Sequence, residues 1–331
     1  MKKRKIVNTG SLKSELLSII GKYKRMPEVR WLRTGLHALD LAIGNGIPLG
    51  RIVEIYGNES SGKSLLAWTV AKAFQNVGGI VILFDVEATA PREFMEQVGV
   101  NHELFILGDG KTVEEIKAEI IEKVNEIRGV DKECPILIIW DSIAATTSDG
   151  EWEDKGALIP KSNMGSRAKA MSEFFRQLTI WLTEQNVTLF CINQVREKIG
   201  IVYGNKEESP GGRGLKFHAS LRIQINRGKQ LKDDGVYQGQ KAALTIFKNK
   251  VGPQFRKAEI DIRPEVGYDV WTGLVDMLIA AKRVESINGG YFKYHDKKYD
   301  DKEIAKACEE NPELLKEWIY GSGIPSSGDN I

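Results

Sequence analysis

The chain has 331 residues, of which 42% are hydrophobic, enough for one large domain with appendages or for two domains. Its 47 basic and 45 acidic residues leave a formal net charge of +2, so a polyanion would have to be held by local clusters of cations. No apolar run approaches the ~20 residues that span a bilayer, and residues 1–5 lack the hydrophobic segment of a secretory signal. The three cysteines are widely separated and argue against a disulfide framework or a zinc site. We therefore expect a soluble, cytoplasmic protein with no membrane partner.

The N-terminal segment predicts one short amphipathic helix followed by a polar linker. Ser11 can cap this helix, and apolar residues such as Leu12, Leu16 and Ile19 fall along one stripe of its surface. A lone amphipathic helix covers its apolar face either on its own chain or on another molecule. We expect residues 1–33 to form this helix and linker and to dock on a neighbouring copy of the chain.

Four short, continuous apolar runs alternate with helical patterns in the next part of the chain. Continuous rather than alternating apolar runs are typical of strands that are covered on both faces of a parallel sheet. The order predicts an α/β fold with a doubly wound, mostly parallel sheet, in which ligands collect at the carboxyl ends of the strands. The predicted strands are 52–56, 80–84, 136–140 and 187–192, and the predicted helices are 65–74, 113–127 and 168–185.

The first predicted strand runs directly into Gly57-Asn58-Glu59-Ser60-Ser61-Gly62-Lys63-Ser64, which fits the phosphate-loop pattern G-x-x-x-x-G-K-[ST]. The glycines let the backbone turn tightly and point successive N–H groups at one place, beside the positive end of the following helix. By the logic of this motif, Lys63 reaches the β- and γ-phosphates and the hydroxyl of Ser64 binds a magnesium ion. A turn that only reverses the chain needs no Gly-Lys-Ser triplet. The predicted nucleotide-binding residues here are Gly57, Glu59, Ser60, Ser61, Gly62, Lys63, Ser64 and Leu65.

Polar side chains also follow the other three predicted strands. Asp141 ends the third strand, where a carboxylate either holds magnesium or caps the next turn. Glu87 lies just past the second strand, where it can orient a water for attack on the γ-phosphate, with Asp85 as the competing residue. Gln194 follows the fourth strand, and its amide is suited to sense the terminal phosphate.

A long loop rich in glycine and cationic residues follows Gln194, from residue 195 to 215. Arg196, Lys198 and Arg213 are among its cations, and Tyr203 lies near its middle. Flexible backbone with cationic side chains suits a sugar-phosphate strand, and Tyr203 can stack on bases or wedge between them. Basic clusters are also common on ordinary solvated surfaces, so composition alone leaves both interpretations open.

Three segments carry a more specific pattern. They are Gly50-Arg51-Ile52-Val53-Glu54-Ile55-Tyr56-Gly57 with the phosphate loop, Ile192-Asn193-Gln194-Val195-Arg196-Glu197-Lys198-Ile199-Gly200, and Phe247-Lys248-Asn249-Lys250. In this order they resemble the RecA family of DNA strand-exchange recombinases. The resemblance runs from about residue 34 to residue 267, and its second segment is far more specific than a phosphate loop.

The resemblance implies roles for the nucleotide site. Lys63, Ser64 and Asp141 would bind ATP, with Ser64 and Asp141 holding its Mg²⁺. Glu87 would activate the attacking water, and Gln194 would link the γ-phosphate to the second DNA-binding loop. The segment after Glu87 lacks the aspartate and tyrosine with which the family holds adenine, and Phe94 would stack on the base instead.

The resemblance also implies contacts outside that site. Lys248 and Lys250 would reach the ATP of the neighbouring protomer and stabilise charge in its transition state. The first DNA-binding loop would lie around residues 156–165, and the second around residues 195–212. The implied DNA-binding residues are Met164, Gly165, Arg167, Lys169, Arg196, Lys198, Ile199, Tyr203, Gly211, Gly212 and Arg213.

The expected organisation is an N-terminal arm (1–33), a RecA-like ATPase and DNA-binding core (34–267), a small α/β domain (268–320) and a disordered tail (321–331). The small domain reads as a helix at 271–282, a hairpin at 284–294 that turns at Asn288-Gly289-Gly290, and a helical stretch at 301–319 with a break near Pro312.

The expected function is that of an ATP-dependent recombinase. It would form helical filaments on single-stranded DNA, pair that strand with a homologous duplex, and hydrolyse ATP at protomer interfaces when DNA is bound. One alternative is a ring-forming ATPase or helicase on the same core. Another is a binding module that keeps nucleotide but has lost turnover.

Overall fold

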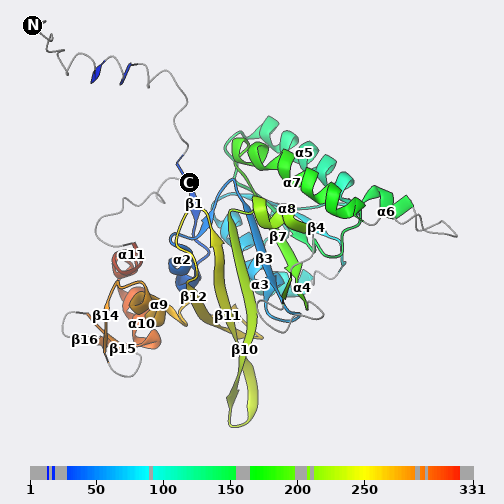
Figure 1. Ribbon diagram of the computed structural model, residues 1–331. Coiled ribbons are helices and arrows are strands. Elements are labelled where there is room, and N and C mark those ends of the chain that lie inside the picture. The colour runs from blue at the N-terminus through cyan, green and yellow to red at the C-terminus, as the bar shows by residue number, and fades with distance from the viewer. Residues whose placement is uncertain are drawn as a thin grey trace, which may run out of the picture.

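A mixed sheet of nine strands forms the centre of the computed structural model, with helices on both faces and a smaller sheet with its own helices to one side (Figure 1). The structure describes residues 13–14, 17–18, 28–88, 92–153, 165–197, 207–208, 212–287, 291–294 and 297–320. Within these ranges, no helix combines the length and the apolar character needed to cross a bilayer.

The central sheet confirms the predicted α/β class. Its strand order is β13-β12-β11-β10-β3-β7-β6-β4-β5, and the strands β10, β3, β7, β6, β4 and β5 run parallel. All four strands predicted from apolar runs lie side by side in this parallel part, each extended by one or two residues at its carboxyl end. They are β3 (Ile52–Gly57), β4 (Ile80–Asp85), β6 (Ile136–Asp141) and β7 (Val187–Gln194), and β5 (Phe105–Leu107) is added at the edge.

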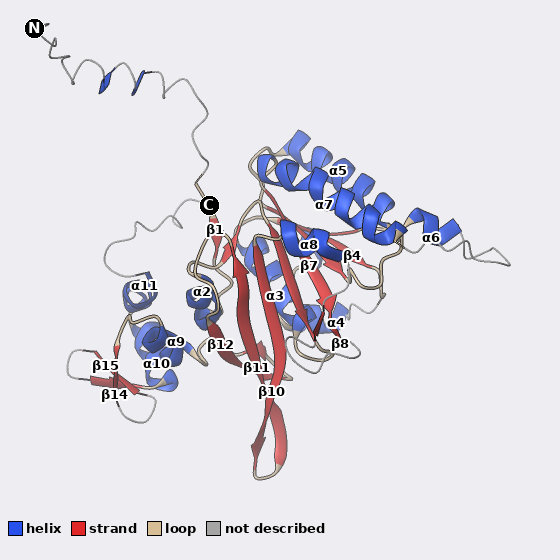
Figure 2. Cartoon of the chain, viewed as in Figure 1, coloured by secondary structure: helices blue, strands red, loops and turns tan. Residues whose placement is uncertain are grey.

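Helices cover both faces of the sheet (Figure 2), and the sheet separates the apolar core into two layers. The three predicted helices are confirmed with small shifts at their ends. One of them begins with a capping box, in which Thr112 accepts a hydrogen bond from the Glu115 N–H and the Glu115 carboxylate accepts one from the Thr112 N–H. One face carries α2 (His37–Ile43) and α3 (Lys63–Asn76), and the other carries α5 (Val113–Val130), α7 (Ser166–Glu184) and α8 (Gly212–His218).

Several short elements join these layers. Two of the strands form a small antiparallel pair that brings the chain into the sheet, and two more pair beyond the end of β7. These elements are β1 (Trp31–Leu32), β2 (Ile47–Pro48), α4 (Arg92–Gln97), the 3-10 turn η1 (His102–Leu104), α6 (Asp149–Glu153), β8 (Arg196–Glu197) and β9 (Glu207–Glu208).

A long antiparallel extension of the sheet was not predicted from the sequence. β10 (Leu221–Asp233) and β11 (Val236–Asn249) form a hairpin whose outer half projects beyond the sheet (Figure 1). The inner half of β10 is buried, whereas the outer half is mostly polar, so the strand shows no continuous apolar run. β12 (Lys257–Arg263) and β13 (Gly267–Tyr268) complete the antiparallel edge.

The C-terminal part confirms the predicted helices and hairpin, although its turn at residues 288–290 lies outside the described residues. A third strand was missed, and it makes a three-stranded antiparallel sheet. Phe292, Ile304 and Trp318 are buried in its core, which packs against α9 (Leu274–Ala280), and α9 in turn contacts α2. The elements are α9 (Leu274–Ala280), β14 (Glu285–Ile287), β15 (Tyr291–Tyr294), β16 (Lys297–Tyr299), α10 (Asp301–Glu310) and α11 (Pro312–Tyr320).

The proposed division of the chain at residues 33, 267 and 320 stays a prediction. Most of the N-terminal arm and all of residues 321–331 lie outside the described residues.

Candidate nucleotide site

The phosphate loop connects the carboxyl end of β3 to the first turn of α3, as the motif requires. At both glycines of the loop, neighbouring atoms leave no room for a side chain. A Cβ on Gly57 would lie 1.9 Å from the carbonyl oxygen of Ile225, and one on Gly62 would lie 2.7 Å from the Tyr268 hydroxyl. Gly62 also has a φ of +99°, which L side chains rarely adopt. The loop can therefore take this conformation only with glycine at both positions.

Two residues far away in the sequence support the loop from outside, and sequence reasoning missed both. The Gln240 side chain donates a hydrogen bond to the Ser60 carbonyl at 3.0 Å, and the Tyr268 hydroxyl donates one to the Gly62 carbonyl at 3.1 Å. They come from β11 and β13 in the antiparallel extension. Only knowledge of that extension's register would have identified them.

Two polar groups of the loop are available to a phosphate. The Ser61 hydroxyl is buried and has no hydrogen-bond partner within the described residues. The Lys63 ammonium donates to the Asn58 carbonyl at 2.7 Å. Burial lowers the pKa of Lys63, and the Asp141, Glu59 and Glu87 carboxylates act in the opposite direction. A buried hydroxyl without a partner, beside the ammonium of a buried lysine, fits a site that takes an anion.

Ser64 and Asp141 meet at the same edge of the sheet. The Ser64 hydroxyl donates a hydrogen bond to Asp141 Oδ2 at 3.0 Å. The pKa of Asp141 is raised to about 6, chiefly by burial, and the Glu87 and Asp85 carboxylates add to the increase. No group of three or more His, Cys, Asp or Glu residues in the described ranges makes a metal cage by itself. One hydroxyl and one carboxylate fit an ion that also takes phosphate oxygens and water as ligands.

Glu87 is held by two donors from neighbouring strand ends. The Gln194 amide donates to Glu87 Oε1 at 3.1 Å, and the Ser142 hydroxyl donates to the same oxygen. Asp85 lies beside Asp141 in the β4–β6 register. Ser142 was not among the expected site residues, although its position directly after Asp141 would have suggested it. The structure thus brings together the expected catalytic carboxylate and the expected phosphate sensor.

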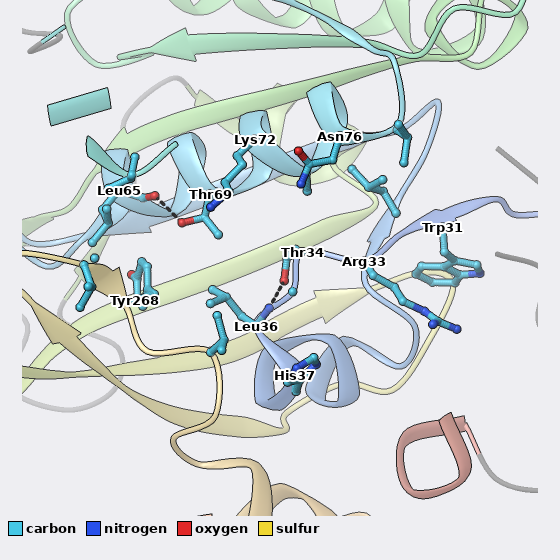
Figure 3. Close-up of a pocket in the computed structure, with 18 of the residues that line it drawn as sticks. Trp31, Arg33, Thr34, Leu36, His37, Leu65, Thr69, Lys72, Asn76 and Tyr268 are labelled. Carbon is cyan, nitrogen blue, oxygen red and sulfur yellow. Dashed lines mark hydrogen bonds between the residues drawn. The ribbon is translucent and has the colours of Figure 1, made fainter. Parts of the chain in front are cut away.

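The remaining expected nucleotide contacts are less concentrated. Glu59 is exposed, and Leu65 is buried in the core. Phe94 on α4 is half-buried and packs against the same core, so base stacking by its ring stays a prediction. A separate cavity of about 560 Å³ lies along α3, and residues 31–37 and 266–268 also line it (Figure 3). No residue from 57 to 64 lines it.

The first group of expected DNA contacts lies at the start of α7. Gly165 precedes the helix with a φ of +108°. Arg167 donates a hydrogen bond to the Ala144 carbonyl at 3.1 Å, and Lys169 is exposed. Arg167 therefore ties α7 to the segment after β6 and is partly buried, whereas Lys169 is exposed.

The second DNA-binding loop is only partly described. The expectation of irregular structure up to residue 215 was wrong, because α8 begins at Gly212 and Arg196 lies in the β8–β9 pair. The side chains of Arg196 and Arg213 are not described. Met164, Lys198, Ile199, Tyr203 and Gly211 lie outside the described residues.

Lys248 and Lys250 lie at the end of the sheet opposite to the phosphate loop. Asn249 pairs with Leu221, which pairs with Val53 near the start of β3, whereas the loop follows the last residue of β3. Lys248 donates hydrogen bonds to the carbonyls of Lys216 and Phe217, at the carboxyl end of α8, and Lys250 donates to the second of these at 3.1 Å. These lysines thus do not approach the nucleotide site of their own chain.

The fold and the site define a phosphate-loop nucleotide-binding protein on a doubly wound sheet. The model of the RecA N-terminal domain family matches residues 11–269. Proteins named Protein RecA are similar to this chain over most of its length. The protein of Thermus thermophilus is 38% identical over 294 residues, which cover 88% of this chain and 84% of the relative. Corresponding values are 38% over 279 residues (83% and 67%) in Ruminococcus albus and 36% over 311 residues (93% and 86%) in Helicobacter pylori. The chain belongs to the RecA family.

Proposed function

We propose that this RecA-family chain is an ATP-dependent DNA recombinase and DNA-dependent ATPase. The hydrogen bond between Gln194 and Glu87 carries the proposal. It joins the carboxylate expected to activate water to the strand that leads into the expected DNA-binding loop. Such a connection lets the state of the nucleotide site reach that loop.

The residues of the phosphate loop fit ATP with Mg²⁺. Lys63, the Ser61 hydroxyl and the N–H groups of the loop supply donors for phosphate oxygens. Ser64 and Asp141 offer two oxygen ligands to the ion, which when bound neutralises charge on the phosphates. Asp141 keeps the Ser64 hydroxyl in place, and Lys63 attracts the terminal phosphates.

Glu87 orients the attacking water and accepts its proton. Both of its described donors bind Oε1, so within the described part of the chain Oε2 is the oxygen left to face a water. A γ-phosphate that attracts the Gln194 amide competes with Glu87 for the same donor. The end of β7 then moves, and the change passes into the loop that follows.

The DNA partners and the filament belong to the same proposal. Residues of both loops hold the phosphates of single-stranded DNA, and a homologous duplex is tested by base pairing, so binding is broad in sequence and sensitive to salt. Lys248 and Lys250 act on the nucleotide of the next protomer, which their distance from their own phosphate loop supports. Residues 1–33 dock on that neighbour, residues 34–267 carry both sites, and residues 268–320 form the small C-terminal domain. A cytoplasmic location is also part of the proposal. It is supported by the three cysteines, which are buried and form no disulfide, as is usual in a reducing compartment.

A titration of ATPase activity with single-stranded DNA tests this function. We expect strong activation by DNA, together with open helical filaments in electron micrographs made with a non-hydrolysable ATP analogue. Closed rings would favour the helicase-type alternative, and nucleotide binding without turnover at any DNA concentration would favour the binding module. Either result would refute the proposed function.

A further inference from the structure

A buried carboxylate lies in the middle of β3, outside the residues that contact the nucleotide in the proposed function. The Glu54 side chain is fully buried, and its two oxygens have different partners. Asn193 Nδ2 donates to Oε1 at 3.1 Å, and Arg222 Nε donates to Oε2. The guanidinium of Arg222 also lies over the Tyr56 ring, 4.6 Å from its centroid. Apolar residues often stabilise such a position as well as a buried ion pair does, so stability alone explains Glu54 poorly.

On one side, Glu54 is connected to the nucleotide site of its own chain. The side-chain oxygen of Asn193 accepts a hydrogen bond from the Gln194 N–H at 3.1 Å. The side-chain amide of Gln194 in turn donates a hydrogen bond to Glu87. A short series of hydrogen bonds therefore joins Glu54 to the residues that respond to the terminal phosphate.

On the other side, Glu54 is connected to Lys248. Arg222 is directly opposite Lys248 in the β10–β11 register, so two cations are neighbours there. The pKa of Lys248 is lowered to about 8, first by burial and then by Lys250 and Arg222, whereas Glu54 acts to raise it. Without the charge of Glu54, Lys248 would sit beside an uncompensated guanidinium and would lose its proton more easily.

We propose that Glu54 is a positioning residue for ATP hydrolysis in the neighbouring protomer. It holds Arg222 in place and keeps Lys248 cationic, and through Asn193 it ties this lysine to Gln194 of its own nucleotide site. The inference rests on the proposed function, because it requires that Lys248 acts on a neighbour.

The first test is Glu54→Gln, which keeps the volume of the side chain. The two donors bind different oxygens of Glu54, so in glutamine one of them, Asn193 or Arg222, would face an NH2 group that cannot accept, and the side chain carries no charge. We expect DNA-stimulated kcat to fall at least about tenfold, while the KM for ATP changes less than about threefold. The matched control is Asp261→Asn, which removes another buried carboxylate that is paired with a lysine, Lys241, at 3.4 Å. The control should keep its DNA-stimulated kcat.

Mixed filaments distinguish positioning from simple damage. Glu87→Gln protomers lack the catalytic carboxylate but have intact lysines. Glu54→Gln protomers keep every side chain expected to contact the nucleotide but have impaired lysines. In an equal mixture, half of the Glu54→Gln sites face a Glu87→Gln neighbour, so about a quarter of the wild-type rate per protomer returns. The double variant Lys248→Ala/Lys250→Ala, mixed with Glu87→Gln in the same way, tests the proposed function separately.

Each outcome decides between the two ideas. Recovery in both mixtures supports the inference. Recovery with the lysine variant but not with Glu54→Gln overturns it and leaves the proposed function intact. No recovery in either mixture contradicts the shared active site itself and takes the inference with it. If Glu54→Gln does not fold, Glu54→Asp is mixed with Glu87→Gln instead. Its carboxylate is one methylene shorter and draws back from Arg222 and Asn193, so the same recovery is expected, and its absence would overturn the inference.

Discussion

Asp141→Asn is expected to stabilise the nucleotide-free protein at neutral pH while removing its response to magnesium and nucleotide. The folded structure raises the pKa of Asp141 from 3.8 to about 6, chiefly through burial. At one pKa unit per 1.36 kcal/mol, the ionised carboxylate destabilises the fold by about 3 kcal/mol at pH 7. Asparagine has no charge to bury, and its oxygen can still accept the hydrogen bond from Ser64.

The sign fixes a pH window for this effect. Because the pKa is raised on folding, the native state holds the proton more tightly, and stability falls as pH rises from about 4 through 6. The difference between wild type and Asp141→Asn should therefore be small at pH 4, grow up to about pH 6, and stay constant above it. Unfolding in urea, with EDTA present and at several pH values, measures it.

Nucleotide provides the second half of the test. At a hundredfold excess over its dissociation constant, a ligand raises the free energy of unfolding by about 2.7 kcal/mol. Wild type should show this increase with ATP analogue and magnesium, and Asp141→Asn should show much less of it. A variant that is less stable than wild type at pH 7.5 without metal, or one that keeps the full ligand effect, would refute the reasoning.

Three further predictions follow from the site. Glu87→Gln should bind ATP normally and lower turnover by about 10²–10⁴-fold, which single-turnover assays would measure. Undiminished turnover would transfer the role of orienting the attacking water to Asp85. Lys63→Ala should abolish nucleotide-dependent filaments in electron micrographs, whereas Lys229→Ala on the exposed part of the β10–β11 hairpin should not; normal filaments in the first variant would exclude its nucleotide role. Gly57→Ala should lower the free energy of unfolding by about 1–3 kcal/mol and weaken nucleotide binding, because its Cβ would meet the Ile225 carbonyl. Gly129→Ala in α5, where a Cβ has open space, should raise the free energy of unfolding by about 0.5–1 kcal/mol. Equal effects of the two substitutions on unfolding would contradict the packing argument.

Four strands of the parallel part of the sheet could be predicted from the sequence, because each is a mainly apolar run that is followed by the phosphate loop or by a polar residue. Lys63, Ser64, Glu87, Asp141 and Gln194 were predicted from that pattern together with the phosphate-loop motif, and the structure places them at one edge of the sheet. Asp141 and Gln194 end their strands, Glu87 lies two residues past β4, and Lys63 and Ser64 begin α3, so position along the chain determines position in space.

The residues that support the phosphate loop could not be predicted from the sequence, because their positions depend on pairings between distant segments. Gln240 and Tyr268 contact the loop only because of the register of β11 and β13. The outer half of β10 has no apolar pattern from which a strand could be predicted. Glu54 was visible as one charge in an apolar strand, but its partners lie 139 and 168 residues away.

The central claim is that nucleotide at a protomer boundary sets how firmly the chain holds unpaired DNA. Its most direct test is the affinity for a labelled single-stranded oligonucleotide, with and without ATP analogue and magnesium, at several salt concentrations. We expect affinity to be at least about tenfold higher with nucleotide, and to fall with salt in both states. Equal affinity in the two states at every salt concentration would contradict the coupling.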